Sequence, residues 1–135
     1  MAMKENRMIL SDKWISKAES HWDKSKKSRS SARETMNLIE KAINLNPLNP
    51  RAWADKGFIL KQLGDFHGAL MCLDRALALK QDFIGPWYNK AVLLGLMGKF
   101  KDALACYNEV LRYDPGHEQA IRDRSALQQM MGKLK

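Results

Sequence analysis

The chain repeats itself at a period of 34 residues, and this feature restricts its possible folds more than any other. The pentapeptide LGDFH at Leu63 is echoed by MGKFK at Met97 and again by MGKLK at Met131. At the same offset eight residues recur unchanged: Trp53, Lys56, Gly64, Phe66, Ala69, Leu70, Cys72 and Leu77 return as Trp87, Lys90, Gly98, Phe100, Ala103, Leu104, Cys106 and Leu111. A fixed period of this length is typical of stacked supersecondary units.

Within residues 50–83 the apolar side chains follow two helical stripes. The first stripe has helical spacing and consists of Trp53, Gly57, Leu60 and Leu63, and the second consists of Ala69, Leu70, Leu73, Ala76 and Leu77. Between them stands Gly64-Asp65, a helix-stopping glycine followed by a residue that caps helices. Each repeat is therefore predicted to be an antiparallel helix pair, and the small residue Gly57 predicts a close crossing of the two helices.

Three helix starts are predicted from capping residues. Asn49-Pro50 provides an N-cap followed by proline at the first helical position. Asp114-Pro115 is interpreted in the same way, and the capping box from Ser31 to Glu34 is predicted to open another helix.

The first and last units are less regular than the central two. Trp14 opens a third copy of the motif W-x-x-K-[GA], but it lies 39 residues before Trp53, so about five extra residues are expected in the basic stretch Lys24–Ser30. A register without this insertion places Glu19 and Asp23 where tryptophan and glycine belong, which is physically worse. After residue 117 only one helix of a further pair remains. That helix is polar enough to cap a stack, and the chain is equally compatible with a fragment of a longer array.

The sequence thus predicts an all-α fold of seven helices. Its parts are an N-terminal extension (1–10), a divergent first unit with a longer inter-helix loop (11–49), two regular units (50–83 and 84–117) and a C-terminal capping helix (118–135).

The motif W-x2-K-[GA]-x2-L, followed by [GA]-x-F-x2-A and a proline at the joint, resembles the tetratricopeptide repeat. The main departure is lysine at positions 17, 56 and 90, where leucine is usual. The resemblance implies a right-handed superhelical solenoid in which the first helix of each pair lines a concave groove for a segment of a partner protein.

The groove positions implied by the resemblance extend over all four first helices. In the first unit they are Asp12, Ile15, Glu19 and Trp22, in the third they include Leu96, and in the C-terminal helix they include Gln119, Ala126 and Gln129. The residues predicted to bind peptide are Arg51, Ala54, Phe58, Lys61, Tyr88, Asn89, Val92 and Arg122. Among them, Phe58 and Tyr88 are the expected anchors, and the cations are expected to hold partner carboxylates.

The predicted function is a non-catalytic protein–protein interaction module, a scaffold or adaptor that binds an acidic or amphipathic segment. The carboxylate clamp by which some members of this family hold chaperone tails is not expected, because only Asn89 fits it. Two alternatives stay open: a basic protein associated with nucleic acid, or a self-associating fragment of a longer repeat protein. The first arises from the net charge of +8, which is concentrated in residues 1–33, where nine Lys/Arg stand against four Asp/Glu.

No enzyme activity, cofactor or metal site is predicted, since the histidines and cysteines lack the spacing of catalytic or zinc sites. Cys72 and Cys106 are expected to be thiols on neighbouring units, too far apart for a disulfide. The longest apolar run, AVLLGLMG at Ala91, is much shorter than the roughly 20 residues of a membrane span. The start of the chain lacks the apolar core of a secretory signal, so a cytoplasmic location is expected.

Overall fold

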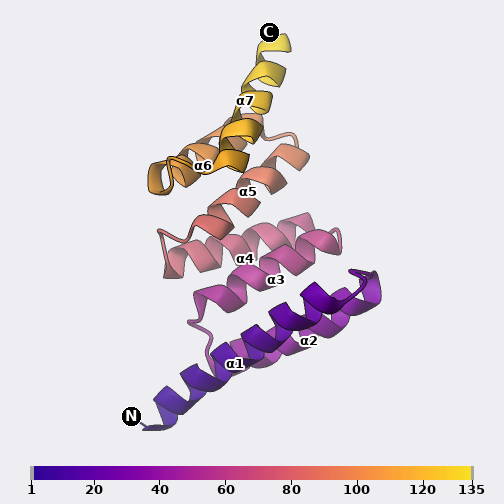
Figure 1. Ribbon diagram of the computed structural model, residues 1–135, viewed down its shortest axis with the longest axis vertical. Coiled ribbons are helices and arrows are strands. Elements are labelled where there is room, and N and C mark those ends of the chain that lie inside the picture. The colour runs from indigo at the N-terminus through magenta and orange to yellow at the C-terminus, as the bar shows by residue number, and fades with distance from the viewer. Residues whose placement is uncertain (1, 135) are drawn as a thin grey trace. The chain divides into compact units, whose positions relative to one another are not determined.

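The computed structural model describes residues 2–134, which form seven α-helices and no strand (Figure 1). The helices are α1 (Ala2–Lys24), α2 (Arg29–Leu45), α3 (Pro50–Gln62), α4 (Phe66–Leu79), α5 (Ile84–Leu96), α6 (Phe100–Tyr113) and α7 (Glu118–Lys133). The predicted all-α class and number of helices are confirmed for the described residues. The chain divides into two compact units, of which the first ends at Gln81 and the second begins at Asp82.

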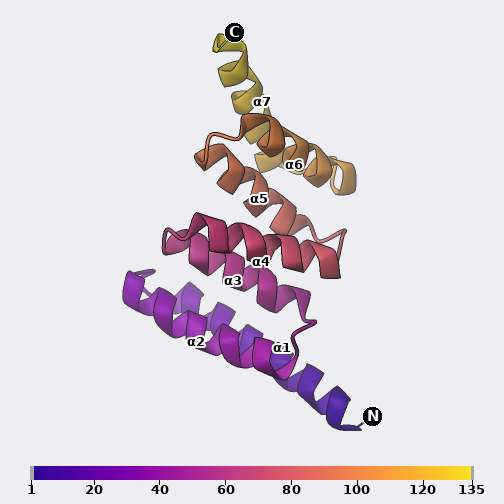
Figure 2. The same ribbon diagram turned by 180° about the vertical axis from the view of Figure 1, so that it is seen from behind.

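The first unit contains α1 to α4, packed as two antiparallel pairs. In both views α1 lies along α2 and α3 lies along α4, while α3 also contacts α2 and α1 (Figures 1 and 2). The core between α1, α2 and α3 consists of almost completely buried side chains, mainly Ile15, Ala18, Ala32, Ile39, Ala42, Ala52 and Ile59. Helix α4 adds the buried side chains Ala69, Cys72, Leu73, Ala76 and Leu77. Removal of these apolar surfaces from water is the main force that holds the four helices together.

The second unit contains α5, α6 and α7, with α6 packed against both neighbours. Its fully buried side chains are Pro86, Ala91, Leu93, Ala103, Val110 and Ala120. In α7 only Ala120 and Leu127 are buried, so most of this helix presents polar side chains to solvent.

The glycine turns predicted from the repeat are present. Gly64 and Gly98 have φ values of +86° and +78°, in the left-handed region that glycine enters without steric penalty. After Gly64, the Asp65 N–H donates to the Leu60 carbonyl (2.9 Å), and Asp65 Oδ1 accepts from the Gly68 N–H (3.0 Å). The turn therefore closes α3 and caps α4 within three residues.

The cap of α3 is confirmed, whereas the predicted start of α2 is wrong. Asn49 is the N-cap of α3 and Pro50 its first residue. Helix α2 begins at Arg29, not after Ser31, because Ser28 is the N-cap and its Oγ accepts from the Ser31 N–H (3.2 Å).

The start predicted at Asp114-Pro115 is also wrong. Asp114 ends α6, and α7 is capped by His117, whose Nδ1 accepts from the Ala120 N–H (3.1 Å). The repeat period explains the error. Asp114 lies 68 residues after Asn46, which ends α2, whereas the residue 68 positions after the N-cap Asn49 is His117.

The extra residues expected in the first repeat (11–49) lengthen α2 more than they lengthen the α1–α2 loop. Helix α2 has 17 residues where α4 has 14, and the α1–α2 connection has four residues (25–28) where the α3–α4 connection has three (63–65). At its other end α1 reaches back to Ala2, so residues 2–10 continue the first helix. Neither this 23-residue helix nor any other between residues 2 and 134 is long and apolar enough to cross a membrane.

The three lysines of the W-x-x-K motif lie over the tryptophans that precede them. The distance from Nζ to the ring centroid is 5.0 Å for Lys17–Trp14, 5.5 Å for Lys56–Trp53 and 5.8 Å for Lys90–Trp87. Residues three apart share a helix face, so the ammonium group reaches the indole ring and is attracted by its negative face. The departure from leucine thus replaces an apolar contact by a cation–π contact.

Cys72 and Cys106 are buried and are not joined in a disulfide. Burial raises the pKa of the Cys72 thiol, so this group is protonated at neutral pH. It packs as a small apolar side chain.

We expect Gly57→Ala to destabilise the protein, because Gly57 is where α3 approaches α4. A Cβ at this position would lie 2.9 Å from Leu73 Cγ and 3.1 Å from the Ala69 carbonyl oxygen. The free energy of unfolding should fall by about 1–3 kcal/mol, the usual effect of overpacking, even though alanine favours a helix by about 1 kcal/mol. Urea denaturation followed by circular dichroism measures the change.

Gly95 in α5 offers the matched control, since no atom would lie within 4 Å of a Cβ there. Gly95→Ala should therefore stabilise the protein by about 0.5–1 kcal/mol. A Gly57→Ala protein as stable as the Gly95→Ala protein would show that the α3–α4 crossing does not require a missing side chain.

Candidate functional site

The residues predicted to bind peptide divide between the two units. Those of the first unit lie on α3 and are Arg51, Ala54, Phe58 and Lys61. Those of the second unit lie on α5 and α7 and are Tyr88, Asn89, Val92 and Arg122. A cavity opens beside each group: we name them the α1–α3 pocket, which Phe58 lines, and the α5–α7 pocket, which Tyr88 and Val92 line.

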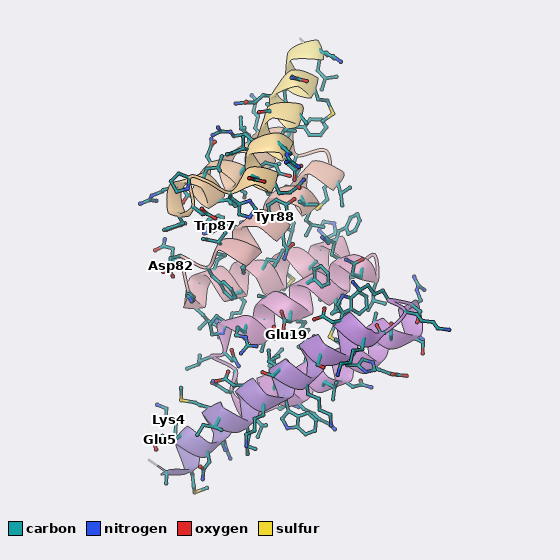
Figure 3. The ribbon with its side chains drawn as sticks, viewed as in Figure 1. Lys4, Glu5, Glu19, Asp82, Trp87 and Tyr88 are labelled. Carbon is teal, nitrogen blue, oxygen red and sulfur yellow. The ribbon has the colours of Figure 1, made fainter. Side chains whose placement is uncertain are left out.

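The α1–α3 pocket has a volume of about 450 Å³ and an apolar floor. Ala18, Thr35, Ile39 and Ile59 form this floor and are almost completely buried. The walls carry polar and aromatic groups, namely Glu19, Trp22, Asp23, Lys27, Asp55 and Phe58. Figure 3 shows Glu19 on the side of α1 that faces α3.

Two carboxyl groups, Glu19 from α1 and Asp55 from α3, meet in this pocket. Oδ2 of Asp55 is shut off from solvent, and no donor among the described residues reaches it. Burial, the hydrogen bond with Glu19 and the negative charge of Glu19 raise the pKa of Asp55 to about 8, although Arg51 acts in the opposite direction. At neutral pH the pair therefore retains a proton.

The arginines predicted to hold partner carboxylates are already paired within the chain. Arg51 Nη2 lies 2.5 Å from Glu19 Oε1, and both side chains are half-exposed. Arg122 Nη2 lies 3.8 Å from Glu118 Oε2 on the same face of α7. A guanidinium group has five donors, so each arginine retains further capacity, but neither is an uncompensated cation.

The aromatic walls of the α1–α3 pocket are Trp22 and Phe58. Their ring centroids are 6.0 Å apart and their planes are inclined by 82°, an edge-to-face arrangement. Lys61 Nζ lies 5.3 Å from the Phe58 ring centroid, and burial lowers the pKa of this lysine. The two rings thus stand nearly at right angles beside the carboxyl pair.

The α5–α7 pocket has a volume of about 400 Å³ and is mainly apolar. Val92, Leu96, Ala126, Leu127 and Met130 contribute most of its apolar side chains. Leu96 is 62% exposed, and Met130 is exposed as well. This pocket therefore presents apolar side chains to solvent at a place where two helices leave space between them.

Tyr88 stands in the α5–α7 pocket and is held from three sides (labelled in Figure 3). Its hydroxyl donates to Asp123 Oδ2 (2.5 Å), its ring stacks on His117 (5.4 Å between centroids) and it meets Tyr107 edge-to-face (6.0 Å). Burial and the hydrogen bond to Asp123 raise the pKa of Tyr88, and burial raises the pKa of Tyr107 to about 12. Both phenols are neutral donors at physiological pH.

The remaining groove positions differ widely in exposure. Ile15 is completely buried and Ala54 is 6% exposed, so these two belong to the core and offer little to a partner. Asp12 accepts a hydrogen bond from Asn49 (3.0 Å), and Gln119 donates one to Asp123 (3.0 Å). Asn89 is half-buried and Gln129 is exposed, and neither lines the α1–α3 pocket or the α5–α7 pocket.

Sequence reasoning omits three residues that shape these pockets: Asp55, Asp123 and Tyr107. Asp55 stands four residues after Arg51 and three before Phe58, so helical spacing already places it on the groove face. Tyr107 lies on the second helix of its pair, and no pattern in the first helices points to it.

The two pockets combine apolar side chains, aromatic rings and a few polar groups, a composition typical of binding sites. Within residues 2–134 no three His, Cys, Asp or Glu side chains are grouped so as to hold a metal ion.

Two models of the tetratricopeptide repeat match the sequence, one over residues 86–117 and the other over residues 38–71. The first match covers nearly all of α5 and α6, whereas the second begins within α2 and ends within α4. The sequence matches no curated protein.

The solved structures with the same fold include tetratricopeptide domains. The first such domain of Spaghetti (RPAP3), bound to the HSP90 peptide SRMEEVD, matches with a TM-score of 0.84 and 16% identity over 93% of this chain and 98% of that chain. The OM64 domain from Arabidopsis gives 0.83 and 16% over 92% and 98%, and the Sgt2 domain from Aspergillus fumigatus gives 0.80 and 15% over 92% and 80%. At such low identity the similarity shows the fold, and it confirms the repeat fold predicted from the sequence.

We expect the raised pKa of Asp55 to make stability fall as pH rises. The folded protein holds the proton of Asp55 up to about pH 8, whereas the unfolded chain releases it near the ordinary value of 3.8. Between these values the folded state binds more protons, so the free energy of unfolding decreases with rising pH. Asp55→Asn, a neutral isostere, should remove this slope and stabilise the protein at pH 9 by about 1–3 kcal/mol, the penalty of a buried group without a partner.

Urea denaturation at pH 5, 7 and 9 measures both effects. Asp102→Asn makes the same change of charge at an exposed position of α6 and should leave the slope unchanged. If Asp55→Asn is less stable than the unmodified protein at pH 9, the carboxyl pair is not a source of destabilisation.

Proposed function

Because this chain belongs to the tetratricopeptide repeat family, we propose that it is a non-catalytic, cytoplasmic interaction module that binds a segment of a partner protein. The observation that carries this proposal is the pair of pockets built around Phe58 and Tyr88. Both rings are fixed by neighbouring aromatic side chains, so binding a partner costs them little conformational entropy. Large, pre-positioned aromatic groups beside apolar cavities are the usual anchors of protein recognition.

Of the acidic and amphipathic segments expected from the sequence, the amphipathic one is better supported. Arg51 and Arg122 are paired with glutamates, and Lys61 lies over the Phe58 ring. The α5–α7 pocket instead offers Leu96 and Met130 to an apolar side chain. An amphipathic helix binds such a surface through apolar residues spaced at i, i+3 or i+4 and i+7.

We further propose the repeat limits expected from the sequence: units at 11–49, 50–83 and 84–117, with the polar helix of 118–135 as a cap. In support, α3 with α4 and α5 with α6 each fall inside one unit. Helix α1 begins before the first repeat (11–49), so residues 2–10 extend the first helix of that repeat.

A chaperone tail of the kind seen in the relative bound to SRMEEVD is not the partner that we propose. Of the positions that would form a carboxylate clamp only Asn89 fits, and the others hold Ala54, Phe58, Gln119 and Asp123. Asp123 would repel a terminal carboxylate. The carboxyl groups of both pockets disfavour the phosphates of nucleic acid for the same reason.

Selection of peptides from a random displayed library on the intact chain tests the proposal. We expect selected peptides with apolar residues at helical spacing. Leu96→Gln should weaken their binding five- to thirtyfold, since a contact at a pocket is worth about 1–2 kcal/mol. Leu48→Gln is the matched control, because Leu48 is 61% exposed but lies in the α2–α3 joint outside both pockets.

The anchors give a second comparison. Phe58→Ala and Tyr88→Ala should each weaken peptide binding by about 1–3 kcal/mol, and the peptide SRMEEVD should not bind. Failure to select any peptide, or selected peptides whose affinity none of the three substitutions changes, would refute the proposed function. Circular dichroism of each variant verifies that it is folded.

A further inference from the structure

We propose that the α1–α3 pocket receives a cationic side chain, lysine or arginine, of the segment that this module binds. The inference rests on the proposed function and adds to it the chemistry of one partner residue. Shape, aromatic walls and charge each support it.

The shape of the pocket suits a long side chain with an apolar stem. Its floor consists of Ile39, Ile59, Ala18 and the buried Thr35, whereas its carboxyl groups lie on the walls. Lysine and arginine match this arrangement, because their methylene stems pack against apolar surface while the charged end reaches polar groups. A volume of about 450 Å³ holds such a side chain together with part of the helix that carries it.

The aromatic walls favour a positive charge. Trp22 and Phe58, whose ring planes are inclined by 82°, both line the pocket. The faces of aromatic rings attract cations, and tryptophan does so most strongly. Within the chain Lys61 already lies over one face of Phe58, which indicates that this surface accommodates cations.

The titratable groups around the pocket also favour a cation over an anion. Helix α1 contributes Glu19 and Asp23, α3 contributes Asp55, and the α1–α2 connection contributes Lys27 as the only cation of the lining. Arg51 compensates Glu19 from outside the lining, and the α2 residues of the pocket, Thr35 and Ile39, do not titrate. An incoming carboxylate would therefore face three carboxyl groups and one lysine.

Entry of a cation is coupled to the loss of a proton. The Glu19–Asp55 pair holds a proton that it keeps because the ionised form lacks a partner in a buried place. A guanidinium or ammonium group supplies that partner, so the carboxylic proton of Asp55 leaves to solvent as the cation binds. Affinity for a cation should accordingly increase as the pH rises from 6 towards 8 and level off above it.

Nuclear magnetic resonance of the intact chain with small probes tests the inference. The probes are n-butylguanidinium, pentanoate and 1-pentanol, which carry a positive, a negative and no charge on similar stems. We expect n-butylguanidinium alone to shift the indole N–H signal of Trp22 saturably, with an affinity that increases from pH 6 to pH 8.5. Asp55→Asn should weaken this binding at least tenfold and remove its pH dependence.

Two further variants keep the result unambiguous. Phe58→Leu removes one aromatic wall but leaves the Trp22 signal, and it should weaken the binding of n-butylguanidinium several-fold. Asp102→Asn changes the net charge equally on α6 and should have no effect, which separates the pocket from general electrostatic attraction. Saturable binding of pentanoate at Trp22, or equal binding of butylguanidinium to the Asp55→Asn protein, overturns the inference.

The peptides from the library selection separate this inference from the proposed function. We expect one lysine or arginine in them whose replacement by norleucine weakens binding at least tenfold on the unmodified protein and little on Asp55→Asn. Peptides that bind tightly without any such residue would overturn the inference and leave the proposed function standing. If no peptide binds, the proposed function fails, and the inferred partner side chain fails with it even where butylguanidinium binds.

Discussion

The fold depends on one steric constraint: in α1, α3 and α5, the first helices of the three helix pairs, the fourth residue after the tryptophan must be small. These residues are Ala18, Gly57 and Ala91, and all three are buried. At Gly57 even a methyl group is too large, because Leu73 and the backbone of Ala69 are already in contact distance. Short inter-axial distances bring the apolar stripes of both helices into van der Waals contact, and burial of those stripes stabilises the unit.

Most of the fold could be predicted from the sequence because the signals for each helix and turn occur in both central repeats. The glycine turns, the helix pairs and the cap at Asn49 are all local signals, and each was confirmed. Ser28 and His117 were missed for a local reason too: a serine-rich stretch offers several caps in succession, and histidine is an unusual one. Competition between neighbouring caps is decided by how far the helix can extend while its apolar face remains buried, and that is a tertiary property.

The candidate site was less predictable, since its properties arise between helices. The family resemblance implied groove positions for Glu19, Trp22 and Phe58, but it gave no reason to expect that Arg51 would pair with Glu19. The proton held by Asp55 depends on burial beside a second carboxyl group contributed by another helix. A surface expected from charge composition to attract acidic segments therefore contains, in the walls of the α1–α3 pocket, groups that favour the opposite charge.

The order of the helix contacts has a kinetic consequence. The main contacts of the first unit join α1 with α2, α2 with α3, α3 with α4 and α1 with α3, and those of the second join α5 with α6 and α6 with α7. Each therefore links helices that are adjacent or next but one along the chain. A polypeptide with such low contact order needs to close only short loops to reach its transition state, and helical proteins of this kind fold in about microseconds to milliseconds. Nascent chains of this sequence are accordingly able to bury their apolar stripes pair by pair while synthesis continues.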